Sequence, residues 1–375
     1  MDKRLSNTGE NWSIGVAWRM QGQIEAWLAL AGQRGASDLH LTAESPPVLR
    51  IDGCLVPIEG VPPLRPAEVA EVLDPLLSDR FRAVLQERGE CDFAYSLAGV
   101  GRFRVNIYRQ RGSLAGALRL IPFGVPSLES LELPAMVAAF AEETQGLVVV
   151  TGPTGSGKST TLAALVDQIN NRRSVHVITL EDPIEYLHRH RHSLVNQREV
   201  GIDCLSFAEG LRAALREDPD VIMIGEMRDL ETIETALTAA ETGHLVLATL
   251  HTPSAALTID RIVGSFPAAQ QNQVRLQLSG VLRGIVAQRL VPRRNGHGRV
   301  AVCEVLVGTP AVANLVREGK TAQVVQMMES GGTYGMSTLA ISATELLTRG
   351  VIGPDSLHLL GVRNGAVNGR GSYAR

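Results

Sequence analysis

Several features that would point to metal, membrane or nucleic acid are scarce in this sequence. Its 375 residues include only four cysteines, none close to another, so neither a disulfide framework nor a zinc site is expected. The amino terminus lacks a signal pattern and no run of about 18 apolar residues occurs, so we expect a reduced, cytoplasmic protein. With 36 basic against 39 acidic residues and 4% aromatics, the composition predicts no nucleic-acid partner.

The first part of the chain has the pattern of a small α+β domain, which we place at residues 21–126. Gln23–Ala31 and Pro66–Gln86 carry apolar residues at helical spacing, and short alternating stretches predict strands. Strands with an interposed helix are typical of this class. The predicted strands are Leu39–Thr42, Val48–Asp52, Phe93–Leu97, Arg102–Arg109 and Leu114–Ile121.

After a stretch rich in proline and glycine at 121–126, the pattern changes to short apolar runs that alternate with helical segments. This alternation is typical of a parallel sheet covered on both faces and predicts an α/β domain over 127–362, with helices from about Thr309 onward. Residues 1–20 and 363–375 are expected to be flexible tails. The apolar runs are Leu147–Val150, Val175–Leu180, Val221–Ile224 and Leu245–Leu250.

The strongest motif is a phosphate loop, Gly152-Pro-Thr-Gly-Ser-Gly-Lys-Ser159, which matches G-x-x-x-x-G-K-[ST] in full between a buried run and a helical pattern. Its glycines let backbone N–H groups curve around phosphate oxygens, Lys158 supplies charge, and Ser159 can ligate Mg²⁺. The alternative is a turn that binds nothing, but chance gives such a match in well under ~1% of chains this size. The residues expected to hold ATP are Gly152, Pro153, Thr154, Gly155, Ser156, Gly157, Lys158, Ser159 and Thr160.

Polar residues follow three of the other apolar runs, where parallel strands present ligand-binding groups. We predict Glu181 as the base that orients the attacking water, with Asp182 as its support. Glu226 is predicted to hold the water shell of Mg²⁺. His251, or His244 at the start of the same run, is predicted to sense the γ-phosphate. Each acid taken alone has the alternative of a cap or a loop salt bridge.

An arginine-rich strand lies in the first domain. Alternation places Arg102 and Arg104 on one face and apolar residues on the other, and Arg119 lies in the next strand. An arginine acting in trans is worth about 10³–10⁵ in rate for P-loop enzymes. A strand facing solvent or nucleic acid is the alternative, and the phosphate loop favours nucleotide contact.

Several longer segments occur in a fixed order between Gly35 and Arg349. They are Gly35–Leu41 with Arg50–Gly53, Gly101–Gly112, Gly152–Thr161, Leu180–Tyr186, Leu211–Asp220 with Gly225–Asp229, and Thr242–Thr252. In this order they resemble the secretion and pilus ATPase superfamily, and specifically its pilus-retraction (PilT-like) members.

The resemblance implies a RecA-like P-loop ATPase core with a smaller, PAS-like first domain. It also implies catalytic roles at the matching positions, with the arginines reaching nucleotide in a neighbouring subunit. These positions are Lys158, Glu181, Glu226, His244, His251, Arg102, Arg104 and Arg119. The resemblance further implies a homohexamer that hydrolyses ATP to retract type IV pili in twitching motility. The implied partners are an inner-membrane platform protein and a paralogous pilus ATPase. The implied location is the cytoplasmic face of the membrane at the pilus base.

Other readings remain open at this point. Secretion, pilus-extension and DNA-uptake ATPases share the superfamily, and in Ala311–Glu318, a stretch resembling a retraction-type helix, Ala313 replaces an arginine of the pattern. Outside the family, the alternatives are a nucleic-acid translocase and a nucleotide-binding module without turnover. The run His188-Arg-His-Arg-His192 invites a metal site, but imidazoles beside arginines suit a cation poorly, which favours a polar loop.

Overall fold

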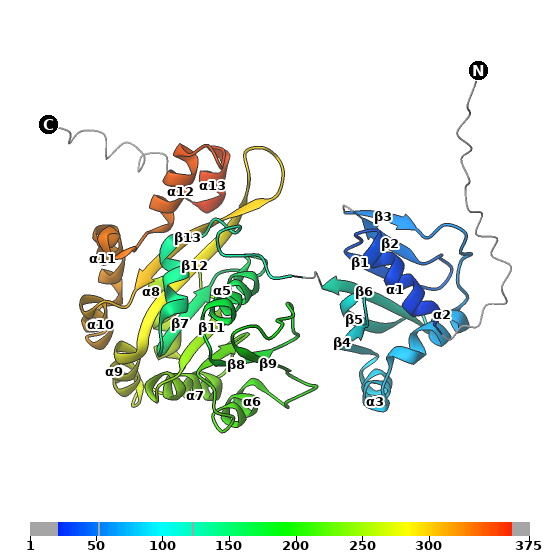
Figure 1. Ribbon diagram of the computed structural model, residues 1–375, viewed down its shortest axis with the longest axis horizontal. Helices are drawn as coiled ribbons and strands as arrows, with labels where there is room; N and C mark the ends of the chain where they lie inside the picture. The colour runs from blue at the N-terminus through cyan, green and yellow to red at the C-terminus, as the bar shows by residue number, and fades with distance from the viewer. Residues whose placement is uncertain (1–21, 52, 122–123, 362–375) are drawn as a thin grey trace, which may run out of the picture. The chain divides into compact units, whose positions relative to one another are not determined.

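The computed structural model describes residues 22–51, 53–121 and 124–361 (Figure 1). The chain divides into two compact units, residues 1–122 and 123–375. The tails predicted at 1–20 and 363–375 lie outside the described residues, as do residues 122 and 123 of the predicted connection. No helix in the described ranges has the length and apolar character needed to cross a lipid bilayer.

The first unit is built on a six-stranded sheet in the order β3-β2-β1-β6-β5-β4, in which every neighbouring pair is antiparallel. Its strands are β1 (Asp38–Leu41), β2 (Val48–Ile51), β3 (Cys54–Pro57), β4 (Glu90–Leu97), β5 (Gly101–Gln110) and β6 (Ser113–Ile121). Alternate residues of β5, among them Phe103 and Val105, join a core with α1 (Gln23–Gln33) and α2 (Pro66–Leu73). The residues between them, Arg102 and Arg104, therefore belong to the opposite face of the sheet.

The helix predicted over Pro66–Gln86 is in fact two helices. α2 ends at Leu73, a short 3₁₀ turn covers Asp74–Leu76, and α3 spans Asp79–Arg88. Pro75 has no N–H to continue the ladder of the first helix. Ser78 then starts the second helix, because its hydroxyl accepts a hydrogen bond from the backbone N–H of Phe81.

The second unit contains a seven-stranded sheet in the order β13-β12-β7-β11-β10-β8-β9. Its strands are β7 (Gly146–Thr151), β8 (His176–Glu181), β9 (Leu194–Glu199), β10 (Val221–Ile224), β11 (Leu245–Leu250), β12 (Leu282–Pro292) and β13 (Arg299–Val307). Only β13 pairs antiparallel with its neighbour; the other pairs are parallel. All four predicted apolar runs are strands of this sheet, and the predicted α/β class is confirmed.

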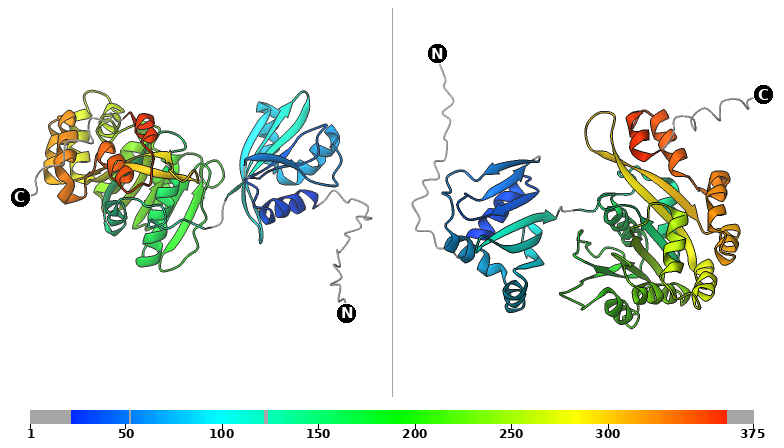
Figure 2. Two further views of the ribbon diagram at one scale, coloured as in Figure 1. Left: turned by 90° about the horizontal axis from the view of Figure 1, so that it is seen from above. Right: turned by 180° about the vertical axis from the view of Figure 1, so that it is seen from behind.

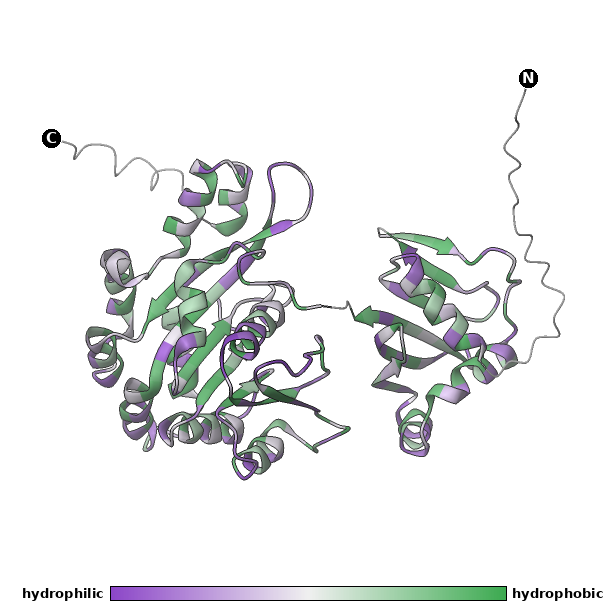
Figure 3. Ribbon diagram, viewed as in Figure 1, coloured by the Kyte–Doolittle hydropathy of each residue, from purple (hydrophilic) through white to green (hydrophobic). Residues whose placement is uncertain are grey.

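Helices cover both faces of this sheet, as the views in Figure 2 show. Val148 and Val150 of β7 pack with α5 (Lys158–Arg172), whereas Leu147 and Val149 face the other helical layer. That second layer consists of α6 (Phe207–Ala214), α7 (Leu230–Glu241), α8 (Ala255–Gly264), α9 (Gln271–Val281) and α10 (Pro310–Arg317). Burial on both faces explains why these strands are continuous apolar runs, visible as hydrophobic strands in Figure 3.

The long strands β12 and β13 were not predicted. Gly284 and Arg289 interrupt the apolar pattern of β12, and its side chains are buried to different degrees along its length. The ends of both strands are covered by α12 (Leu339–Thr348) and α13 (Asp355–Leu360), which form a small core of their own with Val291, Val300 and Val302. α11 (Val324–Ser330) and the short α4 (Ala135–Ala139) complete the unit.

Candidate active site

The phosphate loop joins the end of β7 to the start of α5. Gly157 immediately precedes the helix and has a φ of 88°, a left-handed conformation that glycine adopts without strain. The 15-residue helix that follows directs its free N–H groups and the positive end of its dipole toward the loop. Ser159 is exposed at this end, where its hydroxyl is open to a ligand.

Lys158 curls back over its own loop. Its ammonium donates hydrogen bonds to the carbonyl oxygens of Gly152, at 2.9 Å, and Pro153, at 3.2 Å. Burial lowers the pKa of Lys158, while the negative charges of Glu226 and Glu185 act in the opposite direction. The lysine is thus held inside the loop with two carboxylates in electrostatic reach.

A buried glutamine from β12 supports the loop from behind. Gln288 is 2% exposed and its amide donates to the backbone carbonyl of Ser156 at 2.7 Å. Its carbonyl accepts from the hydroxyl of Thr161 at 3.0 Å. A Cβ at Gly152 would lie 2.3 Å from the backbone oxygen of Gln288, so this glycine is required for the close approach. No sequence motif points to Gln288, because the strand that carries it, β12, is not predicted.

We expect Gln288→Leu to lower kcat/KM for ATP by roughly 10- to 100-fold, because a displaced phosphate loop misplaces the reacting groups. The variant also leaves two buried hydrogen-bonding groups without a partner. Steady-state kinetics measures the effect. A suitable control is Gln277→Leu, which removes a half-exposed glutamine whose amide donates to Glu241. Equal kinetics in the two variants would contradict the role of Gln288.

The predicted Glu226 and His251 do meet beside Lys158. His251 Nε2 lies 3.2 Å from a carboxylate oxygen of Glu226, and His251 Nδ1 lies 3.5 Å from the ammonium of Lys158. Arg228, which the sequence analysis missed, places its Nε 2.8 Å from the other oxygen of Glu226 and Nη1 3.9 Å from Asp182. The ends of β8, β10 and β11 therefore bring their polar groups together, as parallel strands require.

Glu181, the predicted base, is the last residue of β8. Its side chain is buried, at 8% exposure, and burial raises its pKa. One oxygen accepts from Thr179, at 2.7 Å, and Gln197, at 3.0 Å; the other accepts from the backbone N–H of Glu185 at 3.3 Å. Each oxygen of Glu181 thus accepts at least one hydrogen bond, whereas Glu185, four residues further along, is exposed.

The signal that could have identified Glu185 was its place four residues after Glu181 in the same acidic segment. Spacing alone does not tell which of two such carboxylates faces the ligand. In the fold, Glu181 is buried with hydrogen bonds at both carboxylate oxygens, whereas Glu185 is exposed.

His244 does not lie with the other site residues of its own subunit. It precedes β11, whereas His251 follows it, and the backbone N–H of Gly146 at the start of β7 bonds to its carbonyl. Its ring Nδ1 lies 3.0 Å from the carbonyl oxygen of Ala239. A strand the length of β11 separates the two histidines by about 20 Å. His244 therefore lies at the amino-terminal ends of the strands, opposite the phosphate loop.

The three predicted arginines lie in the first unit, on one face of its sheet. Arg104 and Arg119 are direct cross-strand neighbours. Arg119 Nε donates to Asp38 at 2.9 Å, Arg104 Nε lies 3.8 Å from Asp92, and Arg102 donates to the hydroxyl of Ser96 at 3.3 Å. We refer to Arg102, Arg104 and Arg119 together as the arginine strip.

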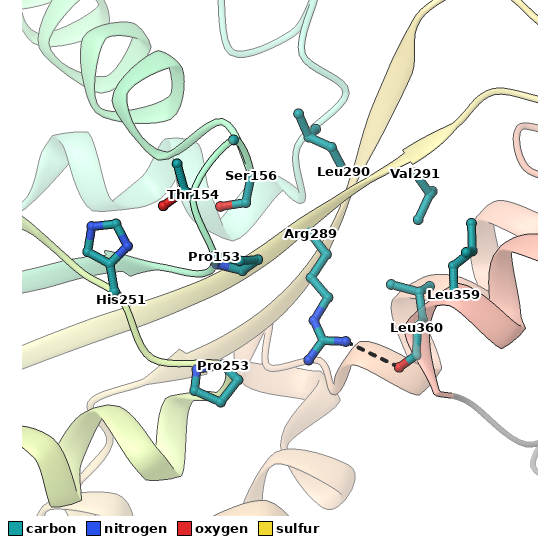
Figure 4. A pocket seen from close by; sticks show the side chains of 11 residues that line it. Pro153, Thr154, Ser156, His251, Pro253, Arg289, Leu290, Val291, Leu359 and Leu360 are labelled. Carbon is teal, nitrogen blue, oxygen red and sulfur yellow. Dashed lines mark hydrogen bonds between the residues drawn. The ribbon is translucent and has the colours of Figure 1, made fainter.

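A pocket of about 400 Å³ opens beside the phosphate loop. Figure 4 shows the loop residues and His251 on one side, the α13 residues Leu359 and Leu360 on the other, and Arg289 of β12 between them. Arg289 Nη1 donates to the carbonyl oxygen of Leu360 at 3.5 Å. The pocket has an apolar wall next to the phosphate site, which suits a flat aromatic base.

The histidines of the run 188–192 each bond to a different part of the chain. The backbone N–H of His188 donates to Gln197 at 2.8 Å, His190 Nδ1 accepts from the N–H of Val195 at 3.1 Å, and His192 Nδ1 lies 2.6 Å from the carbonyl oxygen of Asn171. The run therefore fixes a loop between the acidic segment and β9. Burial lowers the pKa of His188 from 6.5 to about 4.

This pKa predicts a stability loss in mild acid. Below about pH 6.5 the unfolded chain takes up a proton that the folded His188 does not, so the free energy of unfolding falls until about pH 4. Between about pH 7 and pH 5 we expect His188→Gln to lose roughly 1–2 kcal/mol less than the parent protein. Urea denaturation at both pH values measures this. His192→Gln, at an exposed position, should behave like the parent, and identical losses in all three proteins would refute the assignment.

A complete phosphate loop at the end of a strand of a RecA-like sheet, with carboxylates and a histidine from neighbouring strands around its lysine, defines a P-loop ATPase. Residues 129–351 match the protein family described as type II/IV secretion system protein. The chain belongs to this family.

Individual relatives agree with this. The chain is 48% identical over 329 residues to the type IV pilus retraction ATPase PilT of Pseudomonas aeruginosa, covering 88% of this chain and 95% of that protein. It is 46% identical to a twitching motility protein of Neisseria gonorrhoeae, with 83% of each chain covered. The crystal structure of the pilus retraction motor PilT with bound ADP superimposes with a TM-score of 0.85 at 48% identity, covering 92% of this chain and 98% of that one.

Proposed function

We propose that this protein is an ATP-hydrolysing motor that retracts type IV pili. The observation that carries the proposal is the meeting of Lys158, Glu226 and His251 beside one phosphate loop. The high identity to a pilus retraction ATPase over nearly the whole chain supports the biological output.

Within the site, the loop amides and Lys158 bind the β- and γ-phosphates of ATP. Mg²⁺, when bound, spreads the negative charge of the phosphates. The ion usually takes one or two protein oxygens besides phosphate and water, and the exposed Ser159 hydroxyl and the carboxylate of Glu226 fit that need. His251 already contacts both Glu226 and Lys158, so it is placed to respond to the terminal phosphate.

Glu185 is our candidate for orienting the attacking water. It is an exposed carboxylate whose charge acts on Lys158, and a base must lie within hydrogen-bond reach of the water it orients. Glu181 is then a positioning residue, because its oxygen accepts a hydrogen bond from the backbone N–H of Glu185 and fixes the segment between them.

The assembly we propose is a homohexamer in which the arginine strip of one subunit reaches the nucleotide of another. Arg104 and Arg119 are adjacent like charges on one sheet face, and like charges directly opposite destabilise an isolated sheet. An anionic partner would relieve this repulsion. Force would follow if nucleotide binds one domain arrangement better than another. The partners we propose are an inner-membrane platform protein and a paralogous pilus ATPase. The ring would be held at the cytoplasmic face of the membrane at the pilus base.

A second candidate is another output of the same motor, such as secretion, pilus extension or DNA uptake. The observation in its favour is Ala313, which replaces an arginine of the retraction-type pattern. Ala313 lies half-buried in α10, so the exchange leaves the helix intact and removes a charge near its surface.

The experiment combines purified protein with a deletion strain. ATPase activity and molecular mass are measured across protein concentration, and turnover that rises with hexamer formation is expected for sites shared between subunits. The strain is scored for twitching, filament retraction and DNA uptake. Full activity in a monomer would remove the role of the arginines, and normal twitching with defective secretion or uptake would favour the second candidate.

A further inference from the structure

The segment that follows β8, residues 182–186, is held by carboxylates at the ends of two strands. The backbone N–H of Ile184 donates to Glu199 at 3.2 Å, and the backbone N–H of Glu185 donates to Glu181 at 3.3 Å. Both accepting side chains are buried, and they end the neighbouring strands β9 and β8, where they are paired in the register. The edge of the sheet therefore fixes the backbone of this segment on one side.

Tyr186, at the end of the segment, is bonded on two sides. Its backbone carbonyl accepts from the side-chain amide of Gln197, on β9, at 2.8 Å. Its phenol oxygen lies 2.9 Å from the hydroxyl oxygen of Thr160, which follows Lys158 and Ser159 in the first turn of α5. The side chain of Tyr186 therefore joins the segment to the helix end that completes the phosphate loop.

The bond between the two hydroxyl groups leaves Thr160 able to bind nucleotide. A hydroxyl has one donor and two acceptor sites, and either oxygen of this pair can donate. When the phenol of Tyr186 donates, Thr160 keeps its own O–H for a phosphate oxygen of ATP, toward which the free N–H groups of the helix end also point. Hydrogen bonds in such a chain polarise one another, so a phosphate bound to Thr160 strengthens its bond to Tyr186.

We propose that Tyr186 is a positioning residue that sets the distance between the segment 182–186 and the bound phosphates. The inference rests on the proposed function, since the segment carries Glu185, our candidate for orienting the attacking water. The bond to Thr160 makes this carboxylate and the phosphate loop shift together. Phosphoryl transfer depends on positioning, and a misplacement of about 1 Å can cost roughly 10²-fold in rate. Loss of the link should therefore lower kcat more than nucleotide affinity.

The first test needs no nucleotide. Thr160→Val replaces the hydroxyl by a methyl group of similar size, and hydrogen exchange then reports the backbone N–H groups of Ile184 and Glu185. In the parent background we expect about two- to tenfold faster exchange at both, the effect of one lost hydrogen bond. In a Tyr186→Phe background, Thr160→Val should change nothing further. An acceleration that persists without the phenol, or that is absent from the parent, would overturn the proposal.

The second test is a double-mutant cycle on ATP turnover. We expect Tyr186→Phe to lower kcat about tenfold and to change Kd for ADP by less than about twofold. The same change should have no further effect on kcat in a Thr160→Val background. In a Thr160→Ser background, which keeps a hydroxyl, it should again cost about tenfold. The matched control is Tyr95→Phe, which removes a phenol bonded to Glu25 in the first unit and should keep the parent rate.

The cycle also separates positioning from a merely structural role. Equal losses of kcat from Tyr186→Phe in the parent and in the Thr160→Val background would show that the two hydroxyl groups act independently, which refutes the link. A loss of ADP affinity as large as the loss of kcat would refute the positioning role. A parent protein that hydrolyses no ATP would refute the proposed function, while the exchange experiment would still decide the link.

Discussion

Replacement of Lys158 by alanine is expected to abolish ATP turnover and to leave the fold intact. The ammonium is the cation at the centre of the loop, in contact with Gly152, Pro153 and His251. Water that enters in its place cannot supply a preorganised positive charge at the reacting phosphate. Loss of such a group costs roughly 10²–10³-fold or more in kcat. Phosphate release measures turnover, and circular dichroism and thermal unfolding report the fold.

The chain offers a matched control for this variant. Lys320 is the only other lysine among the residues that the structure describes, and it forms an exposed ion pair with Glu318. An exposed pair of this kind contributes about 0–1 kcal/mol to stability, so Lys320→Ala should leave turnover unchanged. If Lys158→Ala retained the parent rate, the assignment of this loop as the ATP site would fail.

Replacement of Glu185 by glutamine is expected to reduce kcat by roughly 10²–10⁴-fold, the usual contribution of a positioned acid or base. Nucleotide affinity should change little, because the amide has the same shape and the loop that holds the phosphates is untouched. Single-turnover hydrolysis and ADP binding, measured together, separate the two effects.

The matched comparison is Glu181→Gln, at the residue that the sequence predicts as the base. Because Glu181 is buried and hydrogen-bonded at both oxygens, we expect a smaller loss, since the change disturbs the bonds to Gln197 and Glu185 without removing the exposed carboxylate of Glu185. A larger loss in Glu181→Gln than in Glu185→Gln would restore the original assignment and refute the present one.

Local sequence was sufficient where function depends on consecutive residues. A phosphate loop is formed by the backbone of one short segment, so Gly152–Ser159 carries its own geometry once a strand precedes it and a helix follows. The ends of β8, β10 and β11 were equally accessible, because strands buried on both faces stand out as apolar runs and the polar residues after them share one edge of the sheet. Glu226 and His251 were found in this way.

Prediction failed where distant segments meet. The helix expected over Pro66–Gln86 broke at Pro75, where a missing N–H outweighed the apolar periodicity. Gln288 and Glu304 lie on β12 and β13, in which polar residues interrupt otherwise apolar runs. Nothing near these two residues in the sequence indicates that Gln288 bonds to the phosphate loop or that Glu304 bonds to the start of α8.

The sequence by itself determined the α/β class of the second unit, its phosphate loop and the edge of the sheet at which catalysis must occur, because these depend on local periodicity and on backbone geometry within one segment. Only the tertiary structure shows that Glu181 is buried while Glu185 is exposed, and that His251 rather than His244 lies beside Lys158. Those choices depend on burial and on hydrogen bonds between residues far apart in the chain, and no spacing rule contains them.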